Sequence, residues 1–200
     1  MIKGYYFITD STLSRKGNVS DVEAAVAASV SVVQYREKCA SSKKMYEEAL
    51  VLRSICKDIT FLINDRVDIA LSVKADGVHL GQGDLPYSEA RRLLEKNKII
   101  GLTVHNVKEA KEAEEIGADY IAVSPVFATN TKSDAGKAVG VEMIRRIREN
   151  VKISIVAIGG IDLSNAEKVV AAGASGLCAI SAVITKQDVK KEIQRFQGLF

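Results

Sequence analysis

Residues 99–123 read IIGLTVHNVKEAKEAEEIGADYIAV and contain one strand–helix–strand unit. Ile99–Thr103 and Tyr120–Val123 are short apolar runs of the kind that form buried strands, and Val107–Ile116 between them has the spacing of an amphipathic helix. Gly117-Ala118-Asp119 separates the helix from the second strand, where a glycine can take the left-handed conformation that ends a helix. Strict alternation of strands and helices favours a parallel sheet with the helices outside it.

The same unit recurs along the whole chain. Strands are predicted at Tyr5–Thr9, Val30–Tyr35, Thr60–Ile63, Gly77–Leu80, Ile99–Thr103, Tyr120–Val123, Ile153–Ile158 and Gly176–Ile180. Helices are predicted at Asp21–Ala28, Lys43–Ile55, Val67–Ser72, Ser88–Lys96, Val107–Ile116, Val141–Asn150, Ser164–Ala172 and Asp188–Phe196. Eight units favour closure over an open sheet, and no Pro/Gly/Ser-rich linker interrupts them. We therefore predict an α/β fold, a single (β/α)₈ TIM barrel that forms one domain over residues 1–200.

The composition is that of an ordinary soluble globular protein, with 47% hydrophobic and 26% charged residues. The net charge of +3 is spread over mixed-charge helices, so we expect no nucleic acid partner. No secretory leader follows Met1 and no apolar run is long enough to cross a bilayer, so we expect no membrane partner. Cys39, Cys56 and Cys178 follow no metal or disulfide spacing, which favours a cytoplasmic location. The sequence leaves open whether the chain forms a homo-oligomer.

Functional residues of this fold gather at the carboxyl ends of the strands. After the second predicted strand, Gln34, Arg36 and Lys38 occupy alternate positions and should point to the same side. Two cations and an amide at the barrel mouth would bind an anion. The alternative is that Arg36 forms no more than an ion pair with Glu37.

Two carboxylates follow neighbouring predicted strands, Asp65 after the third and Asp84 after the fourth. Together they could hold a hard cation such as Mg²⁺, which proteins bind through one or two carboxylates and substrate phosphates. Each could instead cap the helix that follows it, since Asp is a favoured N-cap residue. The spacing does not decide between the two roles.

Two histidines lie near the same end of the predicted barrel. His79 is inside the fourth strand, where it either contacts a ligand in the lumen or is a hydrogen-bonded core residue, and the sequence favours the core role. His105 lies just beyond the fifth strand, which is a better place for a ligand contact.

The last two strands end in sequences suited to a phosphate. Ile158-Gly159-Gly160-Ile161 ends the seventh strand and Ala179-Ile180-Ser181 the eighth, and the loops after these strands are the usual phosphate site of this fold. The alternative is that the glycines form no more than a turn. Residues 127–134 after the sixth strand are polar, contain Lys132 and have the profile of a mobile lid that carries a cation to an anionic substrate.

Taken together, these residues resemble the thiamine-phosphate synthase family, which also includes the related thiazole tautomerases. The resemblance runs nearly from end to end and follows successive strand ends. It covers Tyr6–Asp10, Val33–Lys38, Leu62–Asp68, Gly77–Asp84, Gly101–His105, Thr129–Lys132 and Ala157–Ile161.

The resemblance implies that a hydroxymethylpyrimidine diphosphate couples to a hydroxyethylthiazole phosphate, giving thiamine phosphate and pyrophosphate. It implies Mg²⁺ as the cofactor, held by Asp65 and Asp84. Small phosphorylated heterocycles would be the substrates. The implied diphosphate ligands are Arg36, Lys38, Asn64 and Lys132, with Tyr35 and Glu37 in the same motif; Gln34, His79 and Thr103 would bind the pyrimidine, and Thr129, Asn130, Thr131, Gly160, Ile180 and Ser181 the thiazole phosphate.

The chemistry needs cations aimed at the departing charge more than it needs a general base. Arg36, Lys38 and Lys132, together with Thr103, are therefore the predicted catalytic residues. Two positions depart from the family pattern, since Thr103 stands where Ser is usual and Ser124 where Gly is frequent. Both departures keep the charges of the site and bear on rate and substrate fit.

Two alternatives remain on the same scaffold. A thiazole tautomerase would keep the phosphate site and a histidine such as His105, without a need for the cations and both Asp65 and Asp84. A non-catalytic barrel that binds a phosphorylated ligand is also compatible with the fold. The joint presence of cations and carboxylates favours the synthase.

Overall fold

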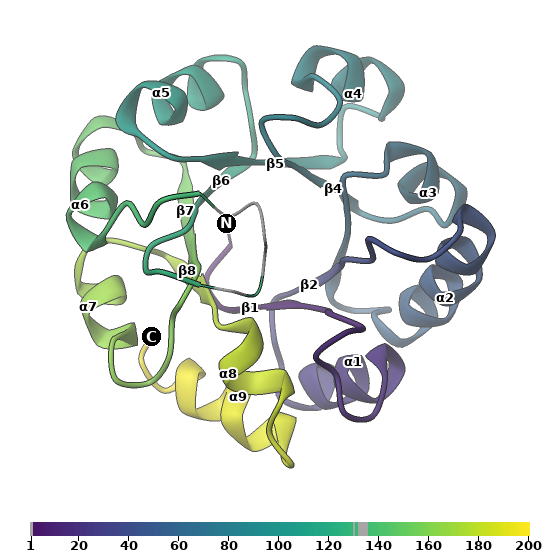
Figure 1. Ribbon diagram of the computed structural model, residues 1–200. Coiled ribbons are helices and arrows are strands. Elements are labelled where there is room, and N and C mark those ends of the chain that lie inside the picture. Colours follow the sequence, from purple (N-terminus) through teal and green to yellow (C-terminus); the bar gives the residue numbers. More distant parts are fainter. Residues whose placement is uncertain (1, 130, 132–135) are drawn as a thin grey trace.

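Eight parallel strands close into a barrel in the order in which they occur in the chain, and the helices surround it (Figure 1). The computed structural model describes residues 2–129, 131 and 136–200. The strands are β1 (Gly4–Ile8), β2 (Val32–Tyr35), β3 (Thr60–Asn64), β4 (Gly77–Leu80), β5 (Ile99–Val104), β6 (Tyr120–Val123), β7 (Ser154–Ile158) and β8 (Gly176–Cys178). The helices are α1 (Asn18–Ala27), α2 (Ser42–Ile55), α3 (Val67–Ser72), α4 (Tyr87–Leu93), α5 (Val107–Glu115), α6 (Val141–Asn150), α7 (Ala166–Ala171), α8 (Ile180–Ile184) and α9 (Val189–Gln197). The predicted (β/α)₈ TIM barrel is confirmed.

The end of the predicted eighth strand is wrong. β8 stops at Cys178, and Ile180, which was expected at the end of that strand, begins the short helix α8. Ile180, Val183 and Ile184 are buried in this helix. A short apolar run of this kind has the same appearance in a buried strand and in a buried helix, so the pattern could not separate them.

The segments after the helices end them as predicted. Gly117, after α5, has a φ of 87°, and Gly173, after α7, has a φ of 103°. Both values lie in the left-handed region that glycine adopts without steric cost. After α3 the same conformation falls on Lys74, with a φ of 53°, directly before the related segment Ala75-Asp76-Gly77.

The aspartates of these segments also tie neighbouring strands together at the amino end of the barrel. Asp119 accepts hydrogen bonds from the backbone N–H of Ile100 in β5 at 2.8 Å and from Arg91 Nη2 at 2.9 Å. Asp76 accepts from the backbone N–H of Phe61 in β3 at 2.8 Å. A buried N–H at a strand end needs such a partner, so these contacts stabilise the end of the barrel away from the mouth.

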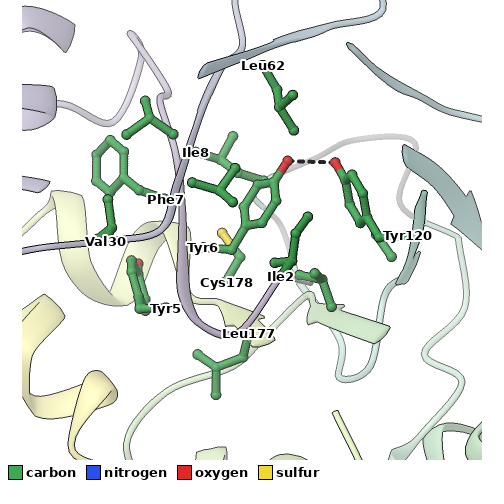
Figure 2. Packing of buried hydrophobic residues seen from close by; sticks show 14 of the residues in the cluster. Ile2, Tyr5, Tyr6, Phe7, Ile8, Val30, Leu62, Tyr120, Leu177 and Cys178 are labelled. Atoms are coloured by element: carbon green, nitrogen blue, oxygen red, sulfur yellow. Dashed lines mark hydrogen bonds between the residues drawn. The ribbon is translucent and has the colours of Figure 1, made fainter. Parts of the chain in front are cut away.

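The barrel lumen and the layer between barrel and helices form one apolar core. Successive residues of β1 serve both layers, because side chains alternate along a strand. Tyr6 points into the lumen, where its hydroxyl meets that of Tyr120, as Figure 2 shows. Tyr5 packs outward against Phe196 of α9, with ring centroids 5.5 Å apart. Among the described residues, no helix has the length and apolar character needed to span a membrane.

Candidate active site

The carboxyl ends of the strands surround three neighbouring cavities. The largest, a cleft of about 380 Å³, is lined by Arg36, Lys38, Asn64, Asp65, His79, Gly81, Gln82, Gly83, Asp84, Thr103, His105 and Ser124. A cavity of about 20 Å³ in the lumen shares His79, Thr103 and Ser124 with the cleft. A third, of about 30 Å³, lies at the ends of β7 and β8 and also touches Ser124. Because they share lining residues, the three cavities form one site.

Arg36 is held in the cleft by the loop after β1. Its Nη1 lies 3.4 Å from Asp10 Oδ2, and its backbone N–H donates to Thr9 Oγ1 at 2.9 Å. Asp10 is buried, and its other oxygen accepts from the backbone N–H of Thr12 at 3.1 Å. Among the described residues, the buried Nε of Arg36 has no hydrogen-bond partner. A donor on this guanidinium therefore remains for an anionic ligand.

The alternative in which Arg36 pairs with Glu37 does not hold. Glu37 instead accepts from Ser11 Oγ at 2.7 Å and from the backbone N–H of Cys39 at 2.6 Å. Burial alone would raise the pKa of Glu37, but these hydrogen bonds hold it below its usual value. Tyr35 faces outward and donates to Glu48 on α2 at 2.7 Å. The structure does not bring Glu37 or Tyr35 into the cleft; both support the segment that carries the cations.

Asp65 is not the cap of α3. The N-cap position belongs to Arg66, and none of the described side chains caps that helix. Asp65 has a φ of 63°, a left-handed value that is uncommon for a residue other than glycine. Its carboxylate accepts a hydrogen bond from Lys38 Nζ and contacts the carboxyl group of Asp84. Asp65 therefore does not cap the helix, and the turn directs it into the cleft.

The pKa values of Asp65 and Asp84 are shifted in opposite directions. Burial raises the pKa of Asp84, and its hydrogen bond with Asp65 raises it further. Burial would also raise the pKa of Asp65, but hydrogen bonds from Asp84 and Lys38 outweigh it and lower that pKa. Asp84 also accepts from the backbone N–H of Gly81 at 2.7 Å. Two adjacent carboxyl groups offer oxygen ligands of the kind that a hard divalent cation prefers.

A chain of hydrogen bonds crosses the lumen below the cleft. Gln34 Nε2 donates to Tyr6 Oη at 2.8 Å, and the hydroxyls of Tyr6 and Tyr120 lie 2.7 Å apart. His79 Nδ1 lies 2.8 Å from Tyr120 Oη, and its Nε2 lies 2.9 Å from Thr103 Oγ1. His79 is thus a hydrogen-bonded core residue, as the sequence favoured, and it also lines two of the cavities.

The cavity at the ends of β7 and β8 brings together Thr129, Thr131, Gly160, Ile180 and Ser181. Ile180 begins α8, and the first N–H groups of a helix have no partner within it. Loops after strands seven and eight with the start of a short extra helix are the usual phosphate site of this fold. Asn130 and Lys132 lie outside the described residues.

Gly160 is required by the packing of the protein itself. It has a φ of 60°, and an added Cβ would lie 2.5 Å from the carbonyl oxygen of Ala128 and 2.8 Å from Phe127 Cβ. The loop after β6 is held against it, since the backbone N–H of Phe127 donates to the carbonyl of Gly159 at 2.9 Å. Gly160 therefore lets two backbones of the site approach closely.

His105 forms a pair with a carboxylate at the rim of the cleft. Its Nδ1 lies 2.9 Å from Glu109 Oε2, which also accepts from the His105 backbone N–H at 2.7 Å. Asn106 caps α5 and bonds to the same glutamate at 2.6 Å. The ring is therefore oriented by its neighbours, while the residue lines the cleft.

Comparison with known proteins assigns this barrel to a family. The family model described as thiamine monophosphate synthase matches residues 5–183. The chain belongs to the thiamine monophosphate synthase family.

Relatives in the thiamine monophosphate synthase family align over nearly the whole chain. A thiamine-phosphate synthase of Methanosarcina mazei is 54% identical over 193 residues, which are 96% of this chain and 80% of the relative. A thiamine-phosphate synthase of Chloroflexus aurantiacus is 47% identical and covers 97% of this chain and 91% of its own. The solved structure of a thiamine phosphate pyrophosphorylase from Pyrococcus furiosus has a TM-score of 0.90 at 41% identity, with 98% of this chain and 94% of that chain covered.

Several residues of the site had no role assigned from the sequence. Asp10 holds Arg36, Tyr6 and Tyr120 join Gln34 to His79, and Ser124 touches all three cavities. Alternation along the first strand could have placed Tyr6 in the lumen, because it is one residue away from the outward Tyr5. Asp10 directly follows the first predicted strand, which could have marked it as a residue of the barrel mouth. Nothing local marks Tyr120, whose partners are distant in the sequence.

Proposed function

We propose that this member of the thiamine monophosphate synthase family couples a hydroxymethylpyrimidine diphosphate to a hydroxyethylthiazole phosphate, forming thiamine phosphate and releasing pyrophosphate. The observation that carries the proposal is the meeting of cations and carboxylates in one cleft. Arg36, Lys38, Asp65 and Asp84 come from the ends of neighbouring strands and line that cleft together. A site with both charges suits an anionic leaving group accompanied by a metal ion.

We propose Asp65 and Asp84 as the residues that hold Mg²⁺. The chemistry of the donor set supports the ion, since Asp65 and Asp84 line the same cleft and offer carboxylate oxygens, the ligands that Mg²⁺ prefers. When bound, the ion would neutralise negative charge on the diphosphate.

The residues of the cleft then have distinct tasks in the reaction. The bond between the methylene carbon and the diphosphate oxygen breaks, leaving a cation that the pyrimidine ring stabilises and a pyrophosphate anion. Arg36 and Lys38 stabilise the departing anion, and Asp10 orients the guanidinium of Arg36. The thiazole nitrogen then forms a bond to the methylene carbon. The cavity at the ends of β7 and β8 binds the thiazole phosphate, so this nitrogen is held near the carbon that it attacks.

The substrates of the reaction are small phosphorylated heterocycles. We propose that the protein acts in the cytoplasm. The three cysteines are free, which supports this placement.

A thiazole tautomerase is the second candidate function. The pairing of His105 with Glu109 favours it, because a carboxylate that fixes one ring nitrogen can leave the other to move a proton. Such an enzyme would move protons on the thiazole and release no pyrophosphate.

The test of the proposal measures pyrophosphate and thiamine phosphate with both substrates and Mg²⁺, and with each component omitted in turn. We expect equal amounts of both products when all are present. Thiazole isomerisation without coupling would show that the protein is a tautomerase. Binding of both substrates without turnover would show that it is a non-catalytic barrel.

Two arginine variants give a matched control. Arg36→Met should remove most of the coupling activity, whereas Arg53→Met should retain it. Both arginines pair with an aspartate, but Arg53 pairs with Asp76 at 3.2 Å at the amino end of the barrel. Equal losses in both variants would point to damage of the fold and would contradict the role of Arg36.

A further inference from the structure

The hydrogen-bond chain in the lumen ends at two residues that line the same small cavity. Gln34 is at one end and Thr103 at the other, with Tyr6, Tyr120 and His79 between them. The cavity of about 20 Å³ has room for about one water molecule or one amino group. A flat ring in the cleft above could therefore place one polar edge, and not its whole body, between the two ends.

The chain has a direction, because each phenol has one proton to donate. Gln34 Nε2 donates to Tyr6, and the 2.7 Å between the two phenol oxygens is compatible with either of them as the donor. Donation from Tyr6 to Tyr120 is the direction in which both phenol protons have an acceptor within this chain of hydrogen bonds. In this direction Tyr120 donates to Nδ1 of His79, the ring proton is on Nε2, and Nε2 donates to Thr103. Burial raises the pKa of Tyr6 and Tyr120, so both phenols keep their protons at neutral pH.

This direction determines what the two ends offer to a ligand. The amide of Gln34 uses its nitrogen toward the tyrosines, so its carbonyl oxygen is the group left to accept. Thr103 accepts from His79 and keeps its own hydroxyl proton to donate. If every hydrogen bond ran the other way, the amide of Gln34 would be flipped, with its nitrogen and oxygen exchanged, and Thr103 would donate to His79. Gln34 would then present a donor to the ligand and Thr103 an acceptor.

We infer that the buried Tyr6–Tyr120 pair fixes the hydrogen-bond polarity of the pyrimidine site, so that Gln34 presents an acceptor and Thr103 a donor. The inference rests on the proposed function for its substrate. A 4-aminopyrimidine matches this polarity, because its amino group donates and its adjacent ring nitrogen accepts. A 4-oxopyrimidine has the opposite pattern, with an exocyclic acceptor and a ring N–H. Tyr6 and Tyr120 are thus positioning residues that act through Gln34 and His79.

The first experiment measures the tautomer of His79 in the free protein by ¹⁵N NMR. The chain has two histidines, so a His105→Gln variant assigns the signals. We expect the proton of His79 on Nε2, and loss of this preference in Tyr120→Phe. A proton on Nδ1 in the unaltered protein would overturn the inference, whether or not the protein couples its substrates.

The second experiment compares the diphosphates of the 4-amino and the 4-oxo pyrimidine as substrates. We define the ratio as kcat/KM for the 4-amino compound divided by kcat/KM for the 4-oxo compound. In Tyr120→Phe this ratio should fall roughly tenfold, the order expected for one hydrogen bond, while KM for the thiazole phosphate stays unchanged. A variant in which both kcat/KM values fall equally would show a structural role and would overturn the inference. If Tyr120→Phe does not fold, Tyr6→Phe breaks the same chain one link away and should give the same fall.

Tyr87→Phe is the control for loss of a phenol hydrogen bond outside the barrel. Its hydroxyl donates to the carbonyl of Gly117 at 2.7 Å, on α4 and outside the barrel. The substrate ratio should be unchanged in this variant, and a fall equal to that of Tyr120→Phe would overturn the inference. An Nε2 proton on His79 together with no coupling in the unaltered protein would instead overturn the proposed function and with it the assigned substrate.

Discussion

The carboxyl groups of Asp65 and Asp84 lie in one cleft beyond the ends of β3 and β4, close enough that each shifts the pKa of the other. The contact is possible because β3 and β4 are parallel neighbours, with Asn64 opposite His79, so that the residues following both strands emerge at the same edge. Two carboxyl groups in contact repel each other when both are ionised, which agrees with the raised pKa of Asp84. A cation placed between them would relieve that repulsion.

The first prediction follows from this pair. Asp65→Asn and Asp84→Asn should each lower kcat sharply without unfolding the barrel. The double variant should lose much less than the product of the single effects, because ligands of one ion act as a unit. Steady-state kinetics, with and without a chelator, measure this. Asp58→Asn, on the exposed surface, is the control. Fully multiplicative losses, or activity untouched by the chelator, would remove the metal from the mechanism.

The second prediction concerns stability alone. Asp119→Ala should lower the free energy of unfolding by about 1–3 kcal/mol, because it leaves the buried backbone N–H of Ile100 without its acceptor. Urea denaturation measures the change. Since Asp119 lies at the amino end of the barrel, kcat of the folded variant should equal that of the parent. A changed kcat would show that this end of the barrel influences the mouth.

The third prediction concerns Gly160. An added methyl group would meet the backbone of Ala128 at 2.5 Å, so Gly160→Ala should displace the loop after β6. We expect a larger increase in KM for the thiazole phosphate than for the diphosphate, together with a lower melting temperature. Gly198→Ala is the control, since its added Cβ would have ordinary contacts at 3.6 Å and beyond. An equal effect on both substrates would contradict the assignment of this cavity to the thiazole phosphate.

The fourth prediction separates the two candidate functions. In a synthase, Lys132→Ala should lower kcat by roughly 10²–10³-fold with a smaller change in KM, because the cation acts on charge that develops late. His105→Asn should be the milder variant. In a tautomerase the order is reversed, since His105 would move the proton. Coupling and isomerisation assays on both variants decide the matter, and isomerisation that depends on His105 without coupling would contradict the synthase.

Much of the cation set could be predicted because strand geometry is local. Gln34, Arg36 and Lys38 were expected on one side of a strand, and Arg36 and Lys38 do line the cleft while Gln34 faces the lumen below it. Asp65 could not be assigned in the same way. Its choice between capping and the cleft depended on a left-handed φ of 63° and on Lys38 in another loop, neither of which a spacing reveals.

The sequence by itself determined the closed barrel and the order of its strands and helices, with the exception of the short helix α8, because hydrophobic periodicity and helix-ending glycines act over a few residues. It also placed most of the charged residues at the strand ends. The tertiary structure alone decided which of them meet. The hydroxyl of Tyr6 forms a hydrogen bond with that of Tyr120, and Arg36 forms an ion pair with Asp10, although the partners are far apart in the sequence. These pairings depend on how the parallel strands are registered when the barrel closes, and register is a property of all the strands together.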